Sequence, residues 1–133
     1  MKRIILAACF AALAAAFFGQ AKKQKSVVSV EEAYAMIAND STILVLDVRT
    51  PEEYAGELGH IDHAVLLPVQ ELEKRIGELK KYDGTTILAV CRSGRRSASA
   101  VEILANSGFR AINIEGGMVK WNEKQLPVVK EGM

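Results

Sequence analysis

Cys91 begins a seven-residue segment whose residue types favour thiol chemistry, Cys91-Arg92-Ser93-Gly94-Arg95-Arg96-Ser97. The apolar residues 86–90 before it predict a buried strand, and residues 98–105 after it predict a helix with one apolar face. We therefore expect the cysteine between the carboxyl end of a strand and the N-terminus of a helix. Open α/β sheets bind ligands at this place, and the free N–H groups of the helix favour negative charge there.

Three arginines, Arg92, Arg95 and Arg96, lie within five residues of Cys91. The pKa of a free cysteine is about 8.5, and a helix N-terminus or nearby cations lower it to roughly 3.5–7.5. The segment thus predicts a thiolate nucleophile in a loop that binds anions. The alternative is an inert, buried cysteine beside a solvated basic loop. That alternative explains neither the sharp turn at Gly94 nor the charged residues around the thiol.

The length and composition indicate a globular protein with one domain. A chain of 133 residues suffices for a single modest core. Apolar residues make up 50% and charged residues 25%, which is ordinary for this class. The net charge is +1 and no basic run extends beyond the arginine cluster, so we expect no binding to nucleic acid.

Residues 1–21 have the pattern of a secretory signal peptide, with Lys2-Arg3 before 15 apolar or small residues, 4–18, and small residues at 19 and 21. The apolar run is shorter than the roughly 18 residues of a membrane-spanning helix. We expect cleavage after residue 21, a short basic linker over 22–26, and a periplasmic or secreted protein without stable membrane insertion. Retention as an anchor, or lipidation at Cys9 in a segment similar to a bacterial lipobox, are the alternatives.

Cleavage after residue 21 would remove Cys9 and leave Cys91 as the single cysteine. An unpaired cysteine in an exported protein indicates a free reactive thiol or an intermolecular disulfide. An oxidising compartment threatens an exposed thiolate. Export of such a residue therefore implies either a reductant or chemistry that caps the sulfur.

Predicted strands and helices alternate along the remaining chain. Apolar runs predict strands at 27–28, 43–46, 64–67, 86–90 and 111–114, and helical patterns cover 30–39, 51–54, 69–79, 98–105 and a short segment around Trp121. Capping boxes at Ser29 and Thr50 mark the first two helix starts. Alternation of this kind favours a three-layer α/β/α domain over 27–133, with a central, mostly parallel sheet of about five strands.

With these segments in order, the chain resembles a single-domain rhodanese over residues 27–128. Four blocks carry the resemblance in the right order: 46–54 (LDVRTPEEY); 59–61 (GHI) with Ala64 and Pro68; 91–97 (CRSGRRS); and 115–117 (EGG) with Trp121, Pro127 and Val128. The chain departs from the family at Asp62-His63, where proline and glycine usually precede the alanine. The shape of that loop is the feature that the departure puts in doubt.

The resemblance implies sulfur transfer without a cofactor or a metal. Cys91 would take the sulfane sulfur of a small anionic donor such as thiosulfate as a persulfide and pass it to cyanide or a thiol, including a periplasmic thiol protein. Residues 92–97 would bind the substrate through backbone N–H groups and through Arg92, Arg95 and Arg96. Asp47 and Arg49 would lie near the site without contacting the substrate, with Arg49 paired to Asp47 or Glu53. We expect a monomer.

Two other functions fit the same architecture. Cysteine phosphatases and arsenate reductases need an arginine six residues after the cysteine, whereas Ser97 stands there and the nearest arginine is Arg96. A non-catalytic module that carries sulfur or binds a partner would use the same pocket. His60 and His63 are a weak signal for a metal because no cysteine or carboxylate cluster accompanies them.

Overall fold

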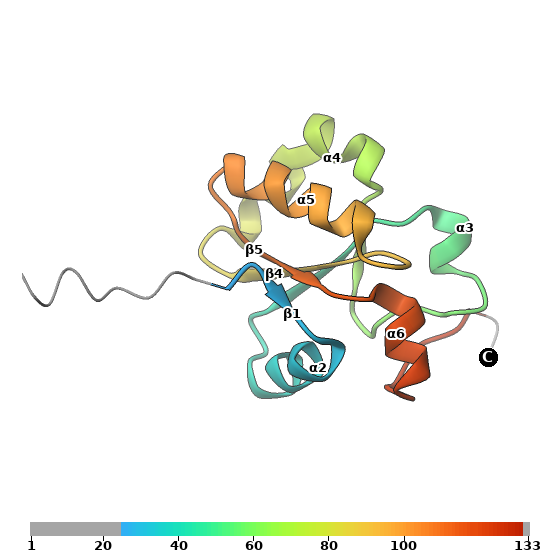
Figure 1. Cartoon of the computed structure of the whole chain (residues 1–133). Coiled ribbons are helices and arrows are strands. Elements are labelled where there is room, and N and C mark those ends of the chain that lie inside the picture. Colours follow the sequence, from blue (N-terminus) through green and yellow to red (C-terminus); the bar gives the residue numbers. More distant parts are fainter. Residues whose placement is uncertain (1–24, 132–133) are drawn as a thin grey trace, which may run out of the picture.

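The computed structural model describes residues 25–131, so the predicted signal peptide and Cys9 lie outside the described part (Figure 1). Five strands form one sheet: β1 (Val27–Val28), β2 (Leu44–Asp47), β3 (Val65–Leu66), β4 (Thr86–Val90) and β5 (Arg110–Ile114). The helices are α2 (Val30–Asn39), α3 (Pro51–Tyr54), α4 (Val69–Arg75), the 3₁₀-helix η1 (Ile76–Tyr82), α5 (Arg95–Asn106) and α6 (Gly117–Glu123).

All neighbouring strands are parallel, in the order β1-β5-β4-β2-β3, which confirms the predicted fold class. Asp47 at the end of β2 lies opposite Val90 at the end of β4. The carboxyl ends of both strands therefore meet at one edge of the sheet. This register places the Asp47-Val48-Arg49 segment beside Cys91.

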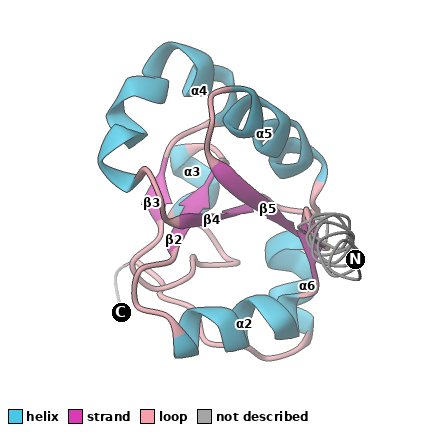
Figure 2. Ribbon diagram, turned by 90° about the vertical axis from the view of Figure 1, so that its left-hand side faces the viewer, coloured by secondary structure: helices cyan, strands magenta, loops and turns pink. Residues whose placement is uncertain are grey.

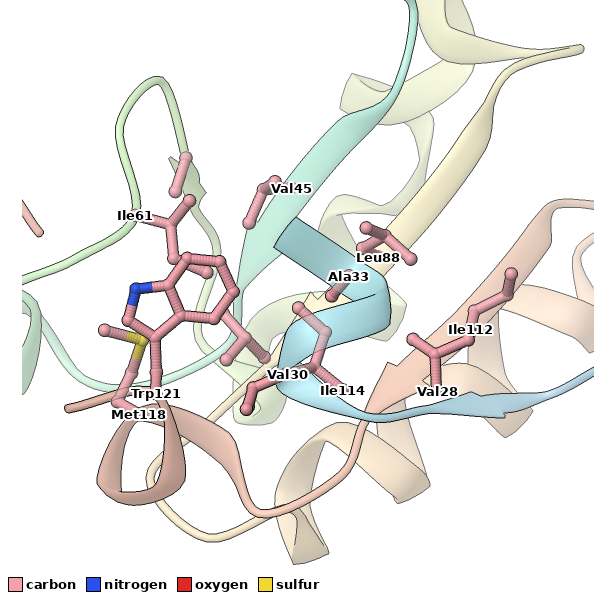
Figure 3. Close-up of a cluster of buried hydrophobic side chains, with 12 residues drawn as sticks. Val28, Val30, Ala33, Val45, Ile61, Leu88, Ile112, Ile114, Met118 and Trp121 are labelled. Atoms are coloured by element: carbon pink, nitrogen blue, oxygen red, sulfur yellow. The ribbon is translucent and has the colours of Figure 1, made fainter. Parts of the chain in front are cut away.

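Helices cover both faces of the sheet (Figure 2): α4 and α5 lie on one side, and α2 and α6 on the other. Successive strand residues serve opposite cores, as expected where both faces of a parallel sheet are covered. In β2, Val45 packs in the core under α2 and α6, whereas Leu44 and Leu46 pack under α4 and α5. Trp121 of α6 lies within the first of these cores (Figure 3) and is 1% exposed.

Both predicted capping residues start their helices. The Ser29 hydroxyl accepts a hydrogen bond from the Glu32 N–H group at 3.1 Å. Thr50 and Glu53 form a reciprocal capping box at the start of α3. The second box fixes Glu53 at the edge of the sheet where Cys91 lies.

Two helix boundaries differ from the prediction. The expected helix 69–79 is α4 followed by η1, because Ile76, Leu79 and Tyr82 recur every third residue and the three-residue turn of a 3₁₀-helix keeps them on the core. α5 begins at Arg95 rather than at residue 98. Arg95, Arg96 and Ser97 therefore belong to the first turn of the helix, and the loop after Cys91 is shorter than expected.

The departure at Asp62-His63 has a visible structural counterpart. His63 has φ 63°, the left-handed conformation that a glycine adopts without strain. The loop thus keeps the backbone that the family's glycine would favour, with a histidine in its place.

Within residues 25–131 no helix is both long and apolar enough to cross a membrane.

Candidate active site

Cys91 lies directly after β4, and its sulfur receives hydrogen bonds from the turn that leads into α5. The Gly94 N–H group lies 3.0 Å from Sγ, and the Ser97 hydroxyl oxygen lies 3.3 Å from it. Gly94 has φ 106°, which a residue with a side chain rarely adopts. The glycine therefore allows the backbone to fold over the sulfur and begin the helix.

Two opposing effects act on the Cys91 thiol. Burial raises its pKa, whereas hydrogen bonds from the Ser97 hydroxyl and from the N–H groups of Ser97, Gly94 and Ser93 lower it. The hydrogen bonds outweigh the burial, so the pKa of the thiol lies below its ordinary value. The site therefore favours the thiolate, the form of cysteine that acts as a nucleophile.

Cys91 is 1% exposed and belongs to the core under α4 and α5. Such burial is what the inert-cysteine alternative predicts. The thiolate-nucleophile hypothesis predicts N–H groups that converge on Sγ, and an inert cysteine in an apolar site has no need of them. A buried sulfur in this setting is reached by the end of a narrow ligand rather than by a bulky one.

The N-terminus of α6 contacts the backbone of the active-site turn and supports it. The N–H groups of Met118 and Val119 donate to the carbonyl oxygens of Cys91 and Arg92, at 2.8 and 3.0 Å. Gly117 has φ 57°, and a Cβ atom there would overlap both carbonyl oxygens. Gly117 therefore permits a close backbone approach that holds the peptide groups around the sulfur.

Arg96 is not free to bind an anion, because its guanidinium forms two parallel hydrogen bonds with Glu53. The N–O distances are 2.7 and 2.8 Å. This pair ties the first turn of α5 to α3 across the edge of the sheet. The hydrogen bonds from Arg96 hold the pKa of Glu53 at about 2, despite its partial burial.

Replacing Glu53 with glutamine is expected to change the acid stability of the fold. The native pKa of Glu53 is depressed from 4.5 to about 2, so its contribution is complete above pH 4.5 and is lost as the pH falls toward 2. We expect Glu53→Gln to lower the free energy of unfolding at pH 7 by about 1–2 kcal/mol, after allowance for partial exposure. Urea unfolding at several pH values measures this loss.

The matched control for this experiment is Glu52→Gln, which removes the exposed carboxylate next in the chain. The difference between Glu53→Gln and the control should shrink between pH 4.5 and 2. A difference that stays constant over this range would show that the ion pair with Arg96 does not stabilise the fold.

Asp47 and Arg49 form a buried ion pair at the end of β2, 0% and 1% exposed. The Arg49 guanidinium donates to both carboxylate oxygens of Asp47, and the contact from Nη2 is 2.8 Å long. The same group also donates to the carbonyl oxygens of Glu53 and Gly59. Arg49 thus ties the end of β2 to α3 and to the loop after it, and its charge is directed at protein groups.

Arg92 and Arg95 are both exposed, as is Ser93. Arg92 lines a recess of about 210 Å³ together with Arg49, Glu53, Gly56, Glu57 and Leu58. A larger recess of about 490 Å³ lies between α2 and α6 and does not include Cys91 or an arginine. The lining of the smaller recess does not include Cys91 either, but this recess adjoins the thiol loop through Arg92.

The two histidines of the 60–63 loop are placed differently. His60 is buried and stacks on the Tyr54 ring, with 3.8 Å between the ring centroids. Its Nδ1 atom lies 3.1 Å from the Tyr54 carbonyl oxygen. His63 is exposed. Among residues 25–131, no three histidine, cysteine or carboxylate side chains gather as a metal site would require.

Asn113 is a residue of this site that the sequence analysis treated only as part of a strand. Its side chain projects from β5 and contacts both Ser97 and Gly94. It is 8% exposed. The available signal was a polar residue inside the apolar run 111–114, since buried amides need hydrogen-bond partners.

The chain has relatives among known proteins. A sequence model of the rhodanese-like domain family matches residues 29–124, and the chain therefore belongs to this family. A putative sulfur carrier protein, YrkF of Bacillus subtilis, is 39% identical over 98 residues, which are 73% of this chain and 51% of that protein. The thiosulfate sulfurtransferase PspE of Escherichia coli is 34% identical over 85 residues, 64% of this chain and 77% of that protein.

A solved structure supports the same assignment. The crystal structure of a rhodanese-related protein from Thermoplasma volcanium aligns with a TM-score of 0.71 and 32% identity, covering 81% of this chain and all of that one. The chain spans about half of the length of the YrkF protein. The chain is thus a rhodanese-like domain whose relatives include sulfurtransferases.

Proposed function

We propose that this protein is a thiosulfate sulfurtransferase that works through a persulfide on Cys91. The thiolate attacks the sulfane sulfur of thiosulfate, an S–S bond forms, and sulfite leaves with the electron pair of the broken bond. A second nucleophile, cyanide or a thiolate, then attacks the outer sulfur and releases the Cys91 thiolate. The PspE relative is named a thiosulfate sulfurtransferase, and this name supports thiosulfate as the donor.

The observation that carries this proposal is the set of hydrogen bonds directed at one sulfur atom. The Gly94 N–H group and the Ser97 hydroxyl lie 3.0 and 3.3 Å from Sγ. A thiolate at Cys91 is an anion at this place, and such donors stabilise an anion more strongly than a neutral group. Arg92, exposed and beside the recess, is the arginine that we assign to the approaching donor.

The pairing of Arg96 with Glu53 argues against phosphate chemistry. A cysteine phosphatase directs an arginine at the oxygen atoms of its substrate, whereas Arg96 is bound in two places by a carboxylate. The loop also contains one residue fewer than that chemistry needs. A comparison of turnover with thiosulfate and with an aryl phosphate tests this point, and we expect activity only with thiosulfate.

Intact mass before and after thiosulfate tests the proposed intermediate. We expect the protein to gain the mass of one sulfur atom at Cys91 and to lose it on addition of cyanide, with one equivalent of thiocyanate released. A protein that gains no sulfur from thiosulfate would contradict the proposed donor.

A second candidate is a sulfur carrier without rapid turnover, which the name of the YrkF relative favours. A carrier would gain sulfur in the same mass experiment but release it slowly to cyanide and to every thiol tried. The rate of release, measured in a single turnover, therefore separates the two functions.

We also propose that the protein is exported after cleavage of residues 1–21. The support is the charge and apolar pattern of this segment in the sequence. Expression of the full chain in a bacterial host should give a periplasmic protein whose N-terminal residue is Lys22. A cytoplasmic product that retains residue 1 would contradict export, and a lipid-modified N-terminus at Cys9 would identify an anchored lipoprotein instead.

A further inference from the structure

A buried chain of hydrogen-bonding groups runs from Cys91 through Ser97 and Asn113 to Gly94. Ser97 is 0% exposed and Asn113 is 8% exposed. The Ser97 hydroxyl oxygen lies 2.6 Å from Asn113 Oδ1 and 3.3 Å from Cys91 Sγ. Asn113 Nδ2 lies 3.2 Å from the Gly94 carbonyl oxygen.

The Gly94 carbonyl fixes the orientation of the Asn113 amide. A carbonyl oxygen only accepts hydrogen bonds, so the Asn113 NH₂ group faces Gly94 and Oδ1 faces Ser97. Oδ1 also only accepts, which makes the Ser97 hydroxyl the donor in the 2.6 Å contact. A hydroxyl has one hydrogen, and therefore Ser97 cannot donate to Asn113 and to Cys91 at the same time.

We propose that Asn113 is a positioning residue that competes with Cys91 Sγ for the single hydroxyl hydrogen of Ser97. When the sulfur is a thiol, its own hydrogen points to the Ser97 oxygen and the hydroxyl donates to Asn113. When the sulfur is a thiolate, the hydroxyl rotates to donate to Sγ. When the sulfur is a persulfide, the charge lies on the outer sulfur and the hydroxyl returns to Asn113.

The hydroxyl must give up its hydrogen bond to Asn113 before it can donate to Sγ. The thiolate is therefore less stabilised, and hence more reactive, than it would be with a hydroxyl directed permanently at Sγ. Nucleophilicity of a thiolate falls as its pKa falls, with a Brønsted coefficient of about 0.4–0.5. The step in which the hydroxyl returns to Asn113 also accompanies loss of charge from Sγ on persulfide formation. The role in the cycle rests on the proposed function, whereas the competition itself concerns only the ionisation of Cys91.

Asn113→Leu removes the competing acceptor with little change in volume. The Ser97 hydroxyl should then point to Sγ permanently, and the pKa of Cys91 should fall by about one unit. The intrinsic reactivity of the thiolate should fall by about threefold at the same time. The measurement is the rate of alkylation by iodoacetamide from acid to alkaline pH on the full chain, followed on the Cys91 peptide by mass spectrometry.

The control is the same substitution in a Ser97→Ala background. Without the hydroxyl there is nothing to redirect, so Asn113→Leu should leave the pKa of Cys91 unchanged there. A merely structural role, such as support of Gly94, would shift the pKa equally in both backgrounds. The charged groups that surround the thiol, Arg96 with Glu53 and Asp47 beside them, are the same in all four proteins and cancel in the comparison.

Loss of the shift in the Ser97→Ala background supports the proposal. An equal shift in both backgrounds, no shift in either, or a rise in the pKa would overturn it. Asn113→Ala provides a second variant if the leucine prevents folding, which thermal unfolding detects. Alkylation needs no sulfur donor, so failure of the thiosulfate assay would leave this result intact.

Discussion

Cys91→Ser should reduce thiosulfate-to-cyanide transfer to the uncatalysed rate, a loss on the order of 10³-fold or more. A serine hydroxyl is not ionised at neutral pH and its oxygen does not form the required sulfur–sulfur bond. The hydroxyl is nearly the same size as the thiol and can accept the hydrogen bond that the Gly94 N–H group donates to Sγ. We therefore expect the variant to fold normally, which thermal unfolding and circular dichroism check.

The other cysteine of the chain supplies the control. Cys9→Ser removes a thiol from the predicted signal peptide and should leave transfer unchanged. Neither variant needs a new buried contact in the described domain. Turnover that persists in Cys91→Ser, or that is lost in Cys9→Ser, would place the reactive sulfur somewhere other than at the end of β4.

Asp47→Asn is expected to destabilise the fold strongly. Both partners of the Asp47–Arg49 pair are within 1% of full burial. Asparagine has the same shape as aspartate but leaves the guanidinium of Arg49 buried without a counter-charge. Breaking one side of such a pair costs about 3–5 kcal/mol, and urea unfolding should show a fall of this size in the free energy of unfolding.

Glu78→Gln makes the same chemical change in an exposed ion pair. Glu78 contacts Arg75 at 2.7 Å, but its side chain is 58% exposed. Exposed pairs contribute about 0–1 kcal/mol, so this variant should unfold almost as the natural protein does. Equal losses from Asp47→Asn and Glu78→Gln would mean that burial does not set the strength of the Asp47–Arg49 pair.

Asp47→Asn should also affect activity more than its position in sequence suggests. Arg49 holds the carbonyl oxygens of Glu53 and Gly59, and Glu53 in turn holds Arg96. A displaced Arg49 would loosen α3 and its hold on the first turn of α5. Partial loss of transfer that parallels the loss of stability would fit this structural role.

The sequence by itself predicted the fold class and the place of Cys91 in the fold. Alternating apolar runs and capped helices are local signals, because strand burial and helix starts depend on nearby residues. The runs 43–46 and 86–90 thus predicted two central strands, and the Ser29 and Thr50 caps located two helix starts. The spacing of residue types around Cys91 predicted a thiol at a strand–helix junction, and the structure places it there.

Only the tertiary structure decided which groups surround the sulfur. The pairing of Arg96 with Glu53 joins residues 43 positions apart, and the amide of Asn113 reaches Ser97 from another strand. Gly117 meets the Cys91 carbonyl because α6 packs against the turn. These contacts depend on the register of the strands and on the packing of the helices against the sheet. A local pattern of residues does not specify either, because both are set by pairing between segments far apart in the sequence.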